Sequence, residues 1–98
     1  MTLLPLVSVL IPCYNHSEYV VECLNSVVKN DYGNTEIVII DDGSNDNSAN
    51  KIEEWINNNK SAVKTKFLTR ANKGLAKTLN ELLTLSTGDF ICLLGFYW

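Results

Sequence analysis

Glu36 to Ser44 reads EIVIIDDGS, and this stretch joins an almost wholly apolar run to a polar turn. Residues 36–40 show no alternation of polar and apolar side chains, which is typical of a strand covered on both faces in a parallel sheet. Asp41-Asp42-Gly43-Ser44 predicts a turn directly after that strand, and Asp46 can cap a helix that follows. The rest of the chain must therefore supply helices to both sides of a sheet.

Strand-like and helix-like segments alternate on both sides of this stretch. Short β-branched or apolar runs predict strands, and apolar residues at helical spacing predict helices between them. The expected strands cover 7–11, 36–40, 64–69 and 89–94, the third being a weaker edge strand, and the expected helices begin near 17, 46 and 75. This β-α-β-α-β-α-β order predicts an α/β fold, with a parallel sheet and helices on both faces.

Two residues are expected to set boundaries, and the cysteines are expected to be structural. Pro12 should close the first strand, because proline has no amide to give to a central ladder. Ser17 should cap the first helix.

Cys13, Cys23 and Cys92 have no C-x-x-C spacing, so we expect small buried apolar side chains and neither a disulfide framework nor a zinc site.

The length and net charge of the chain limit the classes of protein to which it can belong. A chain of 98 residues suffices for one domain, and we expect a single partial domain over 1–98. The net charge of −3, without a basic stripe, argues against nucleic acid as a partner. No apolar run approaches the roughly 20 residues that span a bilayer, and the N-terminus lacks the features of a signal peptide. The sequence therefore predicts a cytoplasmic protein without a transmembrane segment.

In open α/β sheets, ligands bind beyond the carboxyl ends of the strands. After the first strand, Tyr14 could lay its ring against a flat base, and Asn15 offers a donor and an acceptor. Alternatively, Tyr14 is half-buried packing and Asn15 supplies the geometry of a turn. The spacing alone leaves both interpretations open.

Two adjacent carboxylates follow the second strand. Because neighbouring side chains of a strand point in opposite directions, one of Asp41 and Asp42 could face the cleft while the other caps backbone amides. A carboxylate in the cleft could accept the ring N–H of uracil or contact a ribose hydroxyl. Gly43 would allow close approach of the backbone, and Ser44 would fix the turn. The alternative is a polar turn in which both acids cap local amides.

After the third strand, two cations and a glycine precede a helix. Arg70, Lys73 and Gly74 together suggest a place for phosphate at the helix N-terminus. Lys77, one turn later, could also point toward the cleft. A solvated lysine face explains these residues as well. The sequence contains neither G-x-G-x-x-G nor G-x-x-x-x-G-K-[ST], so a dinucleotide fingerprint and a P-loop are absent. His16 is its only histidine, which gives no basis for a Ser-His-Asp triad or a multi-histidine metal site.

Four segments carry a family pattern when they are taken together. They read VSVLIPCYN (7–15), EIVIIDDGSND (36–46), NKGLAKTLN (72–80) and TGDFI (87–91). In this order and at this spacing they resemble the start of a family 2 glycosyltransferase of the GT-A fold, from Val7 to Leu94. Any one motif is weak, but four in register are specific.

The resemblance implies the N-terminal half of a GT-A Rossmann-like fold and a nucleotide-diphosphate sugar as donor, commonly of the UDP type. It places Tyr14 and Asp42 against the base. With the residues after the third strand included, the expected nucleotide-binding set is Pro12, Tyr14, Asn15, Asp41, Asp42, Gly43, Ser44, Asn72, Gly74 and Lys77.

The sequence departs from the family pattern after the fourth strand. There the family carries an acidic D-x-D motif that holds Mg²⁺ or Mn²⁺, but here Leu94 is followed by Gly95-Phe96-Tyr97-Trp98. No metal ligand and no catalytic residue is therefore assigned. We expect the chain to bind the nucleoside without transferring a sugar to the glycan or lipid acceptor of the complete enzyme. The alternative is a non-catalytic association module with a vestigial pocket.

The resemblance also bears on assembly and location. In the family, later strands cover the outer edge of the fourth strand, so an open edge is expected here. A homodimer through this edge, or through the aromatic tail 96–98, would cover the exposed groups. The full-length enzyme is expected in the cytoplasm or at the inner face of a membrane.

Overall fold

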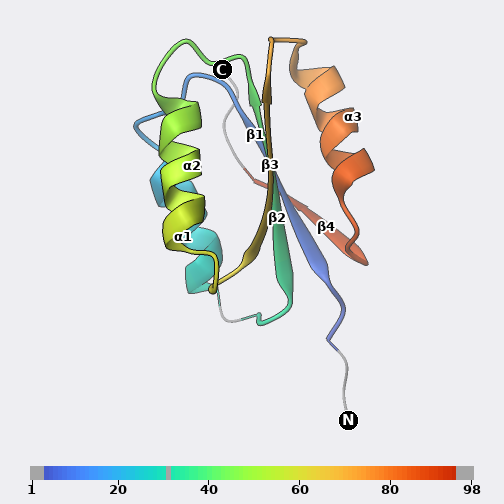
Figure 1. Cartoon of the computed structure of the whole chain (residues 1–98). Helices are drawn as coiled ribbons and strands as arrows, with labels where there is room; N and C mark the ends of the chain where they lie inside the picture. Colours follow the sequence, from blue (N-terminus) through green and yellow to red (C-terminus); the bar gives the residue numbers. More distant parts are fainter. Residues whose placement is uncertain (1–3, 31, 95–98) are drawn as a thin grey trace.

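The computed structural model describes residues 4–30 and 32–94, which form strands and helices in strict alternation. In chain order these are β1 (Val7–Cys13), α1 (Val20–Lys29), β2 (Thr35–Asp42), α2 (Ser48–Asn58), β3 (Lys64–Arg70), α3 (Leu75–Leu85) and β4 (Phe90–Leu93). The strands are all parallel and lie in the order β3-β2-β1-β4. α1 and α2 cover one face of the sheet and α3 covers the other (Figure 1). The α/β fold and the edge position of β3 are thus confirmed.

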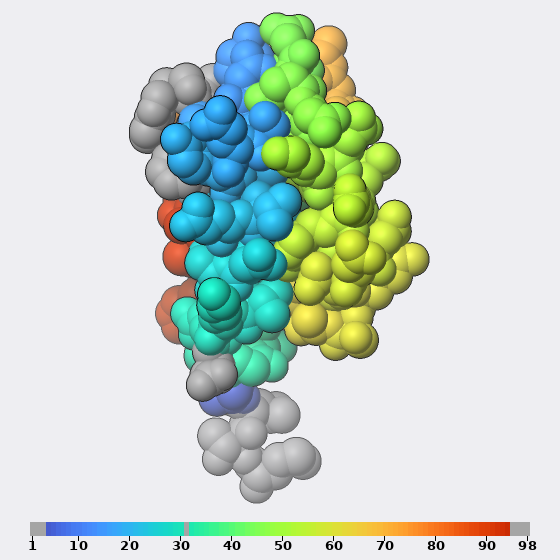
Figure 2. Space-filling view, turned by 90° about the vertical axis from the view of Figure 1, so that its left-hand side faces the viewer, coloured from blue at the N-terminus to red at the C-terminus, as the bar shows by residue number. Residues whose placement is uncertain are grey.

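β2 contributes side chains to both apolar layers of the protein, because alternate residues of a strand point to opposite faces. Ile37 and Ile39 pack beneath α1 and α2, whereas Val38 and Ile40 pack against Leu82 of α3. All five side chains have an exposed fraction of 0%. Figure 2 shows α1 and α2 side by side over the first layer. The uninterrupted apolar run of β2 therefore reflects a strand without a solvent-facing side.

Pro12 does not end the first strand, contrary to the prediction. β1 continues to Cys13, and Pro12 is in register with Ile40 of β2. The carbonyl of Leu10 accepts the amide of Leu94 at 2.9 Å, so residues 10 and 12 direct their polar backbone groups toward β4. β4 ends at Leu93, opposite Leu10. Proline at position 12 therefore costs the sheet no ladder hydrogen bond.

The helix starts also differ in part from the prediction. Ser17 does not cap α1; the helix begins at Val20, whose amide donates to the carbonyl of His16 at 2.9 Å. The amide of Ser17 donates instead to Asp46 Oδ2 at 3.1 Å. Asp46 does not occupy the cap position of α2, which is Asn47, but its Oδ1 accepts the amide of Ser48, the first helical residue, at 3.0 Å. Among residues 4–30 and 32–94, no helix has the length and apolar character needed to cross a bilayer.

The cysteines divide into two buried thiols and one exposed thiol. Cys13 and Cys23 are buried, as predicted, and burial raises the pKa of Cys13 to about 11. The prediction of burial is wrong for Cys92, which is exposed. Its strand, β4, forms an edge of the sheet and is exposed along its whole length.

A buried carboxylate organises the amino end of the sheet. Glu36, at the start of β2, is 1% exposed and accepts hydrogen bonds from the Ser8 hydroxyl at 2.6 Å and the Thr87 amide at 2.7 Å. Lys66 Nζ lies 3.2 Å from its Oε1. Burial by itself raises the pKa of Glu36, but these partners outweigh burial and lower the pKa from 4.5 to about 2. Glu36 thereby joins β1, β2, β3 and the segment before β4.

This network predicts a pH dependence of stability. A carboxyl pKa lowered on folding from 4.5 to about 2 stabilises the protein above pH 4.5 and loses this effect as the pH falls toward 2. Its contribution at neutral pH is roughly 3 kcal/mol. We expect Glu36→Gln to lower the free energy of unfolding at pH 7 and to flatten its decline between pH 4.5 and 2. Urea unfolding at a series of pH values measures both effects, and parallel profiles for the two proteins would contradict the assignment.

Candidate functional site

The carboxyl ends of β1, β2 and β3 meet at one edge of the sheet, at the top of Figure 1. The chain passes from β1 to β2 and β3 on one side and then returns to β4 on the other side of β1. Such a reversal of strand order is where open α/β sheets bind their ligands. Most of the residues predicted for the nucleotide lie in the loops at this edge.

Asn15 and Ser44 join the loop after β1 to the loop after β2. The Asn15 amide donates to Ser44 Oγ at 2.9 Å, and Asn15 Oδ1 accepts the Asn45 amide at 2.7 Å. The amide of His16 donates to Ser48 Oγ at 3.1 Å. Asn15 has a φ of 54°, a left-handed conformation that asparagine tolerates better than most residues. The predicted turn role of Asn15 is therefore present in the structure.

Asp41 closes the turn that follows β2. Its side chain is buried, and its carboxylate accepts hydrogen bonds from the Ser44 hydroxyl, the Ser44 amide at 3.4 Å and Thr69 Oγ1 at 3.0 Å. These contacts hold the turn and also join β2 to β3. Asp41 thus caps local groups and does not face a cleft.

Asp42 is also turned into the protein. Its exposed fraction is 0%, it pairs with the Arg70 guanidinium, and it accepts the amides of Lys73 at 2.8 Å and Gly74 at 3.1 Å. Of the two interpretations that the sequence left open, the structure favours the one in which both acids bind groups of the protein. The physical reason is that a buried carboxylate requires partners, and the positive N-terminus of α3 and Arg70 are both within reach.

The cations after β3 are likewise paired within the protein. Arg70 contacts both Asp42 and Glu81, and Lys73 Nζ lies 3.3 Å from Glu81 Oε1. The amides at the start of α3, which the sequence suggested for a phosphate, donate to Asp42 instead. Lys77 lies exposed on α3. The sequence analysis overlooked the part played by Glu81; the spacing Gly74-Thr78-Glu81 on one helix face was the available signal.

Two further predicted residues shape the edge. Asn72 is exposed, and its Nδ2 donates to the carbonyl of Asp42 at 2.9 Å. Gly43 has a φ of 74°, and a Cβ at this position would lie 2.5 Å from the Asn72 amide nitrogen. Only glycine allows this approach of the two loops. Tyr14 is half-buried in the loop after β1, and Pro12, two residues earlier in the chain, is buried.

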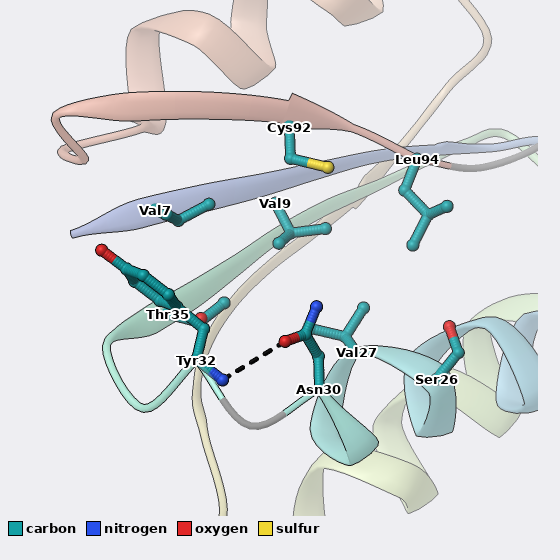
Figure 3. A pocket seen from close by; sticks show the side chains of 9 residues that line it. All are labelled: Val7, Val9, Ser26, Val27, Asn30, Tyr32, Thr35, Cys92 and Leu94. Carbon is teal, nitrogen blue, oxygen red and sulfur yellow. Dashed lines mark hydrogen bonds between the residues drawn. The ribbon is translucent and has the colours of Figure 1, made fainter. Parts of the chain in front are cut away.

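An apolar hollow lies elsewhere, beside the edge strand β4. It has a volume of about 410 Å³, and Figure 3 shows its lining from β1, α1, the loop before β2 and β4. The lining residues are Val7, Val9, Ser26, Val27, Asn30, Tyr32, Thr35, Cys92 and Leu94. None of these side chains is charged, so the hollow suits apolar groups and not a nucleotide diphosphate.

The described residues do not fit a divalent metal ion. Within 4–30 and 32–94, no group of three or more His, Cys, Asp or Glu side chains could hold one. Mg²⁺ requires oxygen ligands, but Asp41 and Asp42 are already bound by hydroxyls, amides and Arg70. The metal-binding position expected in the family falls at Gly95 and beyond, which lies outside the described residues.

Comparison with known sequences identifies relatives over most of the chain. The sequence model described as "Glycosyl transferase family 2" matches residues 8–95. Glycosyltransferase GlyG of Streptococcus pneumoniae serotype 4 is 34% identical over 87 residues, which are 88% of this chain and 28% of the relative. The chain thus spans little more than a quarter of that protein.

Solved structures share the fold over a similar part of their chains. The mannosyltransferase PcManGT from Pyrobaculum calidifontis, in complex with GDP-Man and Mn²⁺, superposes with a TM-score of 0.84 at 26% identity over 92% of this chain and 27% of its own. Staphylococcus aureus TarS 1–349, in complex with UDP-GlcNAc, gives a TM-score of 0.81 at 29% identity over 92% and 26%. The fold is therefore that of the N-terminal part of GT-A glycosyltransferases.

The close approach at Gly43 predicts an unequal pair of alanine variants. Gly43→Ala should combine the strain of a left-handed backbone with the contact to Asn72. Gly74 has a φ of 93°, and nothing lies within 4 Å of a Cβ added there. Gly74→Ala should therefore introduce backbone strain without a steric contact. We expect a loss of about 1–2 kcal/mol for Gly74→Ala and at least ~1 kcal/mol more for Gly43→Ala, measured by urea unfolding. Equal losses would show that the loops separate without cost.

Proposed function

This chain belongs to glycosyl transferase family 2, and from that premise we propose that its carboxyl edge binds the nucleoside of a UDP-type sugar donor. The observation that carries the proposal is the joining of three loops at this edge, with Tyr14 half-buried in the first of them. The residues that we propose either contact the nucleoside or shape its edge are Pro12, Tyr14, Asn15, Asp41, Asp42, Gly43, Ser44, Asn72, Gly74 and Lys77. The complete enzyme would transfer the sugar to a glycan or lipid acceptor.

Within this site the aromatic ring and the carboxylates have different roles. Tyr14 offers a face on which a base can stack. Asp42 supports the base site by holding the segment 71–74 in place. A direct bond from its carboxylate to a ring N–H would have to replace one of its donors, Arg70, Lys73 or Gly74. One structural neighbour was solved with UDP-GlcNAc and another with GDP-Man, so the neighbours do not agree on the base. The choice of uracil is therefore part of the proposal.

We further propose that this segment contributes nucleoside binding and not sugar transfer. Its acids at the carboxyl edge are engaged by protein groups, so a metal-bridged diphosphate finds no ligands among residues 4–30 and 32–94. The β- and α-phosphates should then add little to affinity. The proposed location, in the cytoplasm or at the inner face of a membrane, refers to the complete enzyme.

Titration calorimetry with uridine, UDP and GDP tests the nucleoside site. We expect weak binding of uridine, nearly equal binding of UDP, no gain with Mg²⁺, and weaker binding of GDP. Tyr14→Ala should weaken uridine binding about 5- to 150-fold, because base stacking on an aromatic ring is worth about 1–3 kcal/mol.

Tyr32→Ala is the matched control, since Tyr32 is also half-buried but lies at the amino end of the sheet, where its hydroxyl donates to the Pro5 carbonyl at 2.6 Å. It should leave the uridine affinity unchanged. Strong, Mg²⁺-dependent binding of UDP would overturn the metal-free account. A preference for GDP would overturn the assignment of the base but not of the edge.

A second candidate role, association with another copy, is favoured by the open edge of β4. Phe90, Ile91 and Leu93 are 59%, 46% and 60% exposed, and the strand carries neither lysine nor proline to discourage pairing. Antiparallel pairing of two β4 strands about a two-fold axis would continue the sheet across both copies. It would also cover the mouth of the apolar hollow lined by Cys92 and Leu94 (Figure 3). The aromatic tail 96–98, the other expected interface, lies outside the described residues.

Light scattering over a dilution series tests this association. We propose a dimer at tens of micromolar, and we expect Leu93→Lys to weaken it at least tenfold, because a charged side chain on an edge strand opposes pairing. Leu68→Lys is the control, since Leu68 is 39% exposed on β3, the opposite edge of the sheet. A wild-type protein that remains monomeric at tens of micromolar would contradict the proposal.

A further inference from the structure

Arg70 occupies a position between two carboxylates that lie on different elements. It is the last residue of β3 and stands in register with Asp42 at the end of β2. Its guanidinium donates to Asp42 through Nη1 and to Glu81 of α3 through Nε at 3.0 Å. The side chain is only 12% exposed.

Two further donors of the guanidinium are also used. Nη2 donates to Thr78 Oγ1 at 3.0 Å, and Nη1 also reaches the carbonyl of Ala71 at 3.1 Å. Thr78 is completely buried, and its hydroxyl donates a hydrogen bond to the carbonyl of Gly74 at 2.8 Å. The planar guanidinium of arginine can donate hydrogen bonds to all these partners at once, whereas the single ammonium group of lysine cannot.

Four charged groups balance one another in this cluster. Asp42 and Glu81 carry negative charge, and Arg70 and Lys73 carry positive charge. Burial opposes ionisation of Arg70, but its hydrogen bonds to Glu81 and Asp42 outweigh burial and raise the pKa of Arg70. The hydrogen bond from Arg70 lowers the pKa of Glu81. Arg70 and Glu81 therefore stay charged near neutral pH, and their ion pair is kept.

We propose that Arg70, aligned by Glu81 and Thr78, is a positioning residue for the nucleotide site, an inference that rests on the function proposed above. Arg70 fixes the carboxylate of Asp42, and Asp42 in turn fixes the amides of Lys73 and Gly74. The segment 71–74 is thus held against Gly43 and the loop after β2. Glu81 and Thr78 act on the site from α3, without facing the nucleotide edge themselves.

The general properties of buried ion pairs support a role in geometry more than in stability. A buried salt bridge adds little net stability compared with well-packed apolar side chains, because both charges lose their hydration. The same two strands carry a second buried pair, Glu36 with Lys66, at the amino end of the sheet. That pair gives an internal standard, since it joins β2 to β3 without any link to the nucleotide edge.

The test compares Arg70→Met, Arg70→Lys and Glu81→Gln with Lys66→Met as the control. Each variant is examined for unfolding free energy in urea, for the uridine dissociation constant, and for the NMR amide shifts of Lys73 and Gly74. We expect Arg70→Met to weaken uridine binding at least tenfold, with a smaller loss for Arg70→Lys and about threefold for Glu81→Gln. Lys66→Met should be destabilised but bind uridine within twofold of wild type. The amide shifts should move in the Arg70 and Glu81 variants only.

The outcomes separate the two proposals. If wild-type protein does not bind uridine, the proposed function fails, and the amide shifts still decide whether Arg70 and Glu81 hold Asp42 in place. If wild type binds and the Arg70 and Glu81 variants bind equally well, the positioning role is overturned. A loss of affinity in Lys66→Met as large as in Arg70→Met would also overturn it, because the effect would then follow stability. Should Arg70→Met fail to fold, Arg70→Lys and Glu81→Gln carry the test.

Discussion

β2 is covered on both faces and paired on both edges, so every polar group that it carries must find a partner within the protein. Three of its residues are carboxylates: Glu36 at its start and Asp41 and Asp42 at its end, none more than 2% exposed. Unpaired charges at such positions would be prohibitive. The structure pairs each of them, and in doing so it fixes what lies at either end of the sheet.

The two ends are organised by the same means but to different effect. At the amino end, Glu36 binds groups from β1, β3 and the segment before β4, and these contacts close the fold. At the carboxyl end, Asp41 and Asp42 bind the loops themselves. A ligand edge made of loops requires such support, because loops have few apolar contacts of their own. The acids of the family signature therefore serve first to shape this edge, and any contact with a base depends on that shape.

The order of elements could be predicted from the sequence because it follows from hydrophobic patterning and turn residues, which are local. The partners of the buried acids could not, because they depend on register. Nothing near Asp42 in the sequence indicates that Arg70 stands opposite to it, 28 residues later. The same applies to Pro12, whose tolerance depends on where β4 ends, and to Cys92, whose exposure depends on β4 being an edge strand. Family resemblance indicated which loops to consider as a site, but nothing in the sequence shows which way the carboxylates turn.

The coverage of the sheet separates its two kinds of surface. α1 and α2 together cover one face, and α3 is the single described helix on the other (Figure 1). β4 is an edge strand, and its residues are exposed. Apolar surface consequently gathers along β4 and the adjoining hollow, while hydrogen-bonding groups gather at the carboxyl edge. Apolar surface of this kind is suited to burial against another polypeptide, and a polar edge at a reversal of strand order is suited to a small ligand. β1 connects the two surfaces, because its Leu10 pairs with Leu93 of β4 and the strand ends at Cys13, directly before Tyr14 of the proposed nucleotide loop.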